Sequence, residues 1–136
     1  MVSMIPQNIN RADQYKQEIY EFARVWWESV APHCARFFEI SSQFNRVDGI
    51  EKKQVLLDKM HRRIAKIKSI TCSDKIESMR DDLLSAMNGL TDSLEAGMNN
   101  QQVRSTTRLH EALLDLQHFH VILDRLELDY SAKPGK

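Results

Sequence analysis

The segment IESMRDDLLSAMNGLTDSLEAGM, residues 76–98, decides the fold, because its apolar residues recur at intervals of three or four. That spacing aligns them on one narrow face of a helix. The residues on this face are Ile76, Met79, Leu83, Met87, Leu90, Leu94 and Met98. Thr71 or Ser73, followed by Asp74, is typical of a helix N-cap. We therefore predict a helix over about residues 73–97.

Two further segments repeat this pattern on either side. Residues 48–70 carry an inward row consisting of Leu56, Leu57, Met60, Ile64 and Ile67, and Asp48 with Glu51 resembles a capping box. Residues 101–130 carry a row consisting of Leu109, Leu113, Leu116, Phe119, Leu123 and Leu126. We predict a helix over each of these segments.

The longest periodic segment comes first, over about residues 11–45, with Asn10 as its expected N-cap. Its row consists of Tyr15, Ile19, Phe22, Trp26, Val30, His33, Phe37, Ile40 and Phe44. Pro32 interrupts the backbone hydrogen bonding of this segment but leaves the apolar phase unchanged on both sides. We expect a kink at Pro32 and not two separate helices.

Connections between these four segments are short, and the 136 residues contain only four glycines and three prolines. Short connections make consecutive helices lie side by side in opposite directions. The sequence therefore predicts an all-α fold, an antiparallel up-down four-helix bundle with long helices in a single domain over residues 1–136. Residues 131–136 are expected to form a disordered tail.

The first and last segments carry more apolar surface than one such bundle needs. Each has a second apolar row beside the first, and in an up-down bundle the two helices are neighbours. Exposed apolar patches of this extent are typical of protein interfaces. We expect a homodimer, or a helical protein partner, to bind at Tyr20, Trp27, Phe38, Leu114, Val121 and Leu128. The alternative is that the irregularity at Pro32 skews the first helix so that both of its rows pack internally.

Charge patterning argues against two classes of partner. The 19 basic and 19 acidic residues cancel, so no overall field attracts nucleic acid or an anionic membrane. A basic arc on residues 48–70 is balanced by acidic residues in the next segment, with which we expect it to pair. We expect neither nucleic acid nor a membrane as a partner. Two cysteines without CxxC spacing, and no signal peptide, favour a cytoplasmic protein with reduced thiols.

Motifs for catalysis, nucleotide binding or metal binding are not recognisable, so we expect a non-enzymatic helical interaction or assembly module without a cofactor. Cys72, close to a helix N-terminus, is the one thiol whose pKa the helix dipole could lower, but we favour the interpretation that it is an ordinary loop thiol. The alternative function is a bundle that binds a small molecule or metal in its core near Trp26, His33 and His120. That alternative requires the aromatic and imidazole side chains to surround one internal site.

Overall fold

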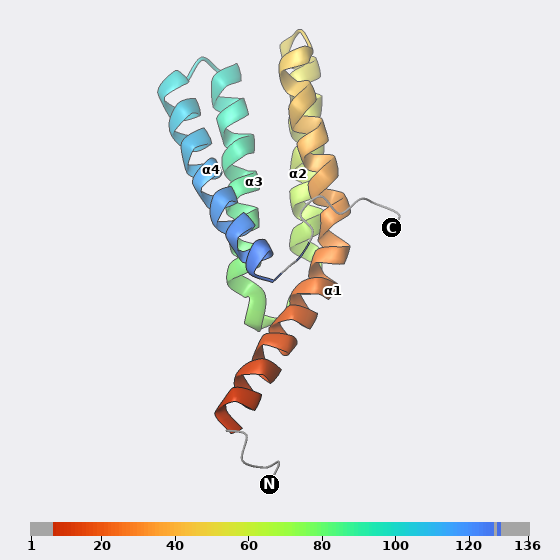
Figure 1. Ribbon diagram of the computed structural model, residues 1–136. Coiled ribbons are helices and arrows are strands. Elements are labelled where there is room, and N and C mark those ends of the chain that lie inside the picture. Colours follow the sequence, from red (N-terminus) through yellow and green to blue (C-terminus); the bar gives the residue numbers. More distant parts are fainter. Residues whose placement is uncertain (1–6, 127, 129–136) are drawn as a thin grey trace.

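The chain is all-helical in the computed structural model, which describes the backbone of residues 7–126 and 128 and the side chains of 17–126 and 128. Figure 1 shows the arrangement of its four α-helices. They are α1 (Gln7–Gln43), α2 (Ile50–Ser69), α3 (Glu77–Met98) and α4 (Gln102–Arg125), with short 3-10 helices η2 (Phe44–Arg46) and η3 (Asp74–Ile76). Within the described residues there is no strand, so the predicted all-α class is confirmed. None of the helices in that part of the chain has both the length and the apolar character required to cross a membrane.

Helix α1 begins earlier than predicted and continues without a break through Pro32. Asn10 therefore lies inside the helix, and its prediction as the N-cap is wrong. The side chain of Tyr15 and the predicted tail, residues 131–136, lie outside the described residues. At 37 residues, α1 extends for about 55 Å at about 1.5 Å per residue.

The turn before α2 uses backbone conformation instead of the predicted capping box. Gly49 occupies the N-cap position with a φ of 98°, a value that favours glycine, and no side chain caps this end of the helix. Asp48 lies one residue too early to cap α2. The cap before η3 is confirmed, because Ser73 Oγ accepts a hydrogen bond from the Lys75 backbone N–H at 3.2 Å.

Two helical hairpins make up the molecule, one of α1 and α2 and the other of α3 and α4 (Figure 1). The hairpins approach each other near the N-terminal end of α3 and diverge toward the α1–α2 and α3–α4 turns (Figure 1). We call the region where they meet the closed end and the region around the two turns the tip end.

Helices α3 and α4 pack unusually closely because small residues face each other. A Cβ atom added at Gly89 would lie only 3.1 Å from the Ala112 Cβ. Further along, Ser93 Oγ donates to the Ser105 carbonyl at 2.7 Å, and Ser105 Oγ donates back to the Ser93 carbonyl at 2.8 Å. Side chains this short let the two backbones approach, and the reciprocal hydrogen bonds set their register.

Acidic residues of α3 pair with α4, although the sequence predicted pairing with α2. Asp92 accepts hydrogen bonds from Arg104 and Arg108, with contacts of 3.0 Å to each. The Arg104 and Arg108 guanidinium groups hold the pKa of the Asp92 carboxyl below its usual value, with the Arg104 hydrogen bond contributing most. Asp82 Oδ2 lies 2.7 Å from His118 Nδ1. These contacts place the charge pairing inside the α3–α4 hairpin because these two helices lie closest together.

Burial follows the predicted rows in α2 but only in part elsewhere. All five residues predicted to face inward from α2 are buried. In α1 the predicted row is mostly buried, but Phe22 is exposed and its prediction as a core residue is wrong. In α3 the row is buried from Ile76 to Met87 and only half-buried from Leu90 to Met98. The row that leads into α3 is therefore buried toward the closed end and only partly covered toward the tip end.

Candidate interaction surfaces

Three aromatic rings from α1 and α4 fill the closed end. The Phe119 ring centroid lies 5.5 Å from that of Trp27 and 6.5 Å from that of Trp26, with which it forms an edge-to-face contact. The sequence placed Trp27 on an outward strip, but this side chain is only 3% exposed, so that prediction is wrong. Both tryptophans are buried, and Phe119 of α4 contacts both of their rings. Trp26 Nε1 is buried here without a hydrogen-bond partner among the described residues.

Three other residues predicted for the interface are partly covered by the protomer itself. Tyr20 is half-buried, and Phe38 is half-buried with its ring 5.2 Å from that of Phe37, edge to face. Leu128 lies beyond the end of α4, where its backbone N–H donates to the Leu123 carbonyl and its side chain packs on the core. None of the three continues an outward strip.

Helix α4 retains the apolar surface predicted for it. Val103, Leu114 and Val121 point away from α3 at spacings that place them on one face, and their exposed fractions run from 44% at Val121 to 83% at Val103. Leu113, next to this face, is 50% exposed. We call Val103, Leu113, Leu114 and Val121 the α4 strip. Leu114 and Val121 are the two predicted interface residues that lie on a free surface.

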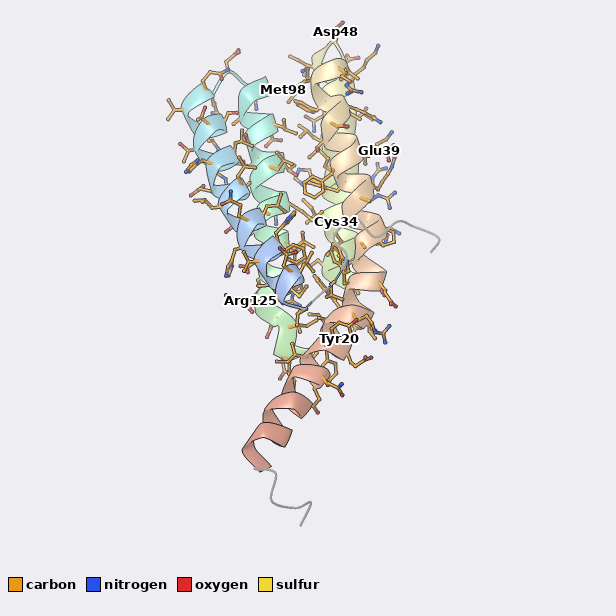
Figure 2. All side chains as sticks on the ribbon, viewed as in Figure 1. Tyr20, Cys34, Glu39, Asp48, Met98 and Arg125 are labelled. Carbon is orange, nitrogen blue, oxygen red and sulfur yellow. The ribbon has the colours of Figure 1, made fainter. Side chains whose placement is uncertain are left out.

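A second uncovered apolar region lies at the tip end, where the hairpins separate. It is a cleft of about 700 Å³ between the α1–α2 turn and the upper part of the α3–α4 hairpin. Its apolar walls consist of Phe44, Ile50, Leu90, Leu94, Met98 and Leu109, with Ser41, Ser93 and Ser105 among them. Figure 2 labels Met98 on the tip of α3 and Asp48 on the tip of the α1–α2 hairpin, which mark its two sides. Lys53 covers the Phe44 ring, with Nζ 4.7 Å from the ring centroid.

The histidines proposed for a core binding site occupy different surroundings. His33 is half-buried against α2, where its Nδ1 accepts from Arg63 at 3.2 Å, whereas His120 lies on the exposed surface of α4. Partial burial, followed by the nearby Arg63 and Lys66 charges, lowers the pKa of His33. These cations also disfavour a metal ion at this position. Across the described residues no group of three or more potential metal ligands gathers.

Neither thiol has the character of a nucleophile. Burial raises the pKa of Cys34 to about 12, as expected for a thiol packed as a small apolar group. Burial also raises the pKa of Cys72, whose Sγ lies 3.5 Å from the Ser73 carbonyl. Cys72 lies in the loop before η3, which agrees with the favoured interpretation as a loop thiol, and its raised pKa is the opposite of the lowering that a helix dipole would give.

Comparison with protein-family models, with curated proteins and with solved structures gives no match for this chain.

Proposed function

We propose that this chain is a non-enzymatic helical interaction module that binds a helical partner or a second copy through α4. The α4 strip carries this proposal, because four large aliphatic side chains on one helix are between 44% and 83% exposed. A helix that packs on a partner typically buries an apolar stripe of residues at helical spacing. The sequence predicted a binding surface shared by α1 and α4. The surface proposed here lies on α4 alone, since Trp27 of α1 is buried.

The wider architecture belongs to the same proposal. The two hairpins form an antiparallel up-down four-helix bundle, with a kink at Pro32 that lets α1 follow the bundle, and the protein functions in the cytoplasm. Ser93 contacts Ser105, whereas Asp82, earlier in α3, contacts His118, later in α4. Residue numbers therefore rise along one helix as they fall along the other, which supports the antiparallel arrangement. The bundle acts as a rigid support that presents the α4 strip.

Affinity capture with a matched pair of variants tests the interaction. Leu114→Glu places a charge at the middle of the α4 strip, and Val55→Glu places the same charge at an equally exposed position of α2, 52% against 54%. A binding protein from the native lysate, or an untagged copy of the chain, should be retained by the unmodified protein and by Val55→Glu and lost by Leu114→Glu. Equal retention by all three forms would contradict the proposal. Circular dichroism establishes that both variants remain helical.

A second candidate function is the binding of an apolar small molecule at the tip end. The cleft of about 700 Å³ has six apolar side chains in its walls and a volume suited to a ligand of drug size. This candidate moves the predicted small-molecule site away from Trp26, His33 and His120. An apolar fluorescent dye should bind the unmodified protein and lose affinity in Leu94→Lys, while Val55→Lys binds normally. Binding that is unaffected by Leu94→Lys would place the dye elsewhere.

A further inference from the structure

The outward face of α4 has the residue spacing of a coiled-coil seam. Its residues at positions 103, 107, 110, 114, 117 and 121 follow one another at intervals of four, three, four, three and four. All six are exposed, and their average interval of about 3.6 residues, which is that of a straight α-helix, keeps the row on one face that a neighbouring helix can contact. They are Val103, Thr107, His110, Leu114, Gln117 and Val121. A single helix packed along this face would contact all of them.

This row of residues is symmetric about its centre, at the level of residue 112. When two copies of α4 run in opposite directions about a two-fold axis at that level, each position of the row meets another position of the same row. Val103 then lies opposite Val121 of the second copy, and His110 lies opposite Leu114 of the second copy. Thr107 lies opposite Gln117 of the second copy, where their polar groups can hydrogen bond. A two-fold interface requires self-complementarity of this kind.

Leu113 completes the centre of the same arrangement. It lies about 100° around the helix from Leu114, on the flank of the seam, and is 50% exposed. Because residue 113 is almost level with the two-fold axis, it packs against Leu113 of the second copy. Leu113 and Leu114 from both copies then form a central cluster of four leucines, and the two valine pairs lie at the ends.

Charges around the seam permit this pairing. The charged residues on the outward half of α4 are Glu111, Asp124 and Arg125, and the formal charges of Asp124 and Arg125 cancel, as do those of the whole chain. Glu111 lies near the two-fold axis, where it approaches its own symmetry mate. Arg108 Nη1 donates to Glu111 at 2.9 Å in each protomer, which compensates that carboxylate. Net repulsion therefore does not oppose association.

From these observations we propose that the α4 strip binds the α4 strip of a second copy, antiparallel, about a two-fold axis level with residue 112. This inference rests on the proposed interaction through α4 and identifies its partner. The 24 residues of α4 extend for about 36 Å. A standard interface buries about 800 Å² on each partner, and we expect a single pair of helices of this length to bury less. The dimer should therefore form and dissociate with concentration.

Thiol cross-linking tests the orientation and register directly. In a Cys72→Ser background, Val103→Cys and Val121→Cys proteins are mixed and treated with a short bismaleimide. We expect a dimer that joins residue 103 of one copy to residue 121 of the other. Each variant alone should stay monomeric, because its two thiols lie about 27 Å apart along the helices at 1.5 Å per residue. Leu113→Cys, next to the axis, should cross-link with itself.

Other cross-linking patterns would overturn the inference. Dimers of Val103→Cys alone and of Val121→Cys alone, without the mixed product, would indicate parallel helices. Absence of every cross-link, with only monomer in sedimentation at about 100 µM, would exclude self-association in the concentration range of weak complexes. If the affinity capture above still depended on Leu114 in that case, α4 would bind a different protein, so that the proposed function stands and this inference fails.

Sedimentation of the two glutamate variants provides an independent measurement. Leu114→Glu should weaken self-association about tenfold or more, because a charge then lies in the central leucine cluster. Val55→Glu should leave the dissociation constant unchanged. Equal dissociation constants for both variants would show that the dimer forms through another surface.

Discussion

The closed end and the tip end of this molecule are built from the same four helices, yet they bury apolar side chains to very different extents. At the closed end, Trp26, Trp27 and Phe119 are fully packed against one another. At the tip end, Leu109 and Ile50 are exposed, and Leu94 is only half-buried around an open cleft. The separation of the hairpins, visible in Figure 1, decides whether an inward-pointing side chain finds a neighbour.

Truncation of either tryptophan at the closed end should have the largest effect on stability. Trp26→Ala and Trp27→Ala each remove a buried aromatic side chain that the surrounding helices cannot replace. We expect a loss of about 3–5 kcal/mol in the free energy of unfolding for each variant. Urea denaturation followed by circular dichroism measures it. If the free energy of unfolding of Trp27→Ala equalled that of the unmodified protein, Trp27 would not be a buried residue of the closed end.

Enlargement of Gly89 tests the close contact between α3 and α4, which contrasts with the open cleft between the two hairpins. Gly89→Val places branched carbon atoms where even a Cβ approaches Ala112 within 3.1 Å. We expect a destabilisation of about 1–3 kcal/mol, because this close contact has no room for additional methyl groups.

Gly97→Val is the matched control for that change. Its added Cβ meets only the Ser105 side chain, with Oγ at 3.2 Å and Cβ at 3.9 Å, whereas the one at Gly89 also meets backbone atoms of α4. Thermal unfolding of the two variants should give a clearly lower midpoint for Gly89→Val. Equal midpoints would mean that α3 and α4 are not held more tightly at Gly89 than near the turn.

Truncation at the tip end should cost far less than at the closed end. Leu109 has the position of a core residue in the sequence pattern, but it lies at the margin of the open cleft. We expect Leu109→Ala to lower the free energy of unfolding by about 1 kcal/mol or less, since no enclosed cavity remains. A loss as large as that for Trp26→Ala, measured in the same urea series, would show that the hairpins close at the tip end in solution.

The smallest expected effect is on pH dependence and involves His33, which lies between the two ends. Because the folded protein lowers the pKa of His33, the unfolded chain binds its proton more readily. Stability is therefore greatest above the unfolded pKa of about 6.5 and declines as the pH falls below it toward the lower folded value. His33→Gln should give a flatter dependence of the melting temperature between pH 7 and 5, roughly the histidine titration range. An unchanged slope would exclude a contribution from His33.

The predicted rows show where reasoning from sequence succeeds and where it stops. In α2, spacing alone identified all five buried residues, from Leu56 to Ile67. The same reasoning placed Leu113 inside and Trp27 outside, and both predictions were wrong. Leu114 and Val121 were predicted to face outward and do so. The prediction succeeded in α2 because that helix has one apolar face. Helices α1 and α4 each have two, and the sequence does not show which of the two is buried.

The sequence by itself determined that this chain forms four helices, and it determined which residues of each helix share a face, since helical geometry relates position in the chain to direction around the axis. Tertiary structure decided which face of α1 and α4 is covered and how far the core extends toward the turns. Those outcomes depend on the angle between the hairpins and on the close approach of α3 and α4 at Gly89, which are properties of packed helices. The free apolar surface on α4 is one consequence of that packing.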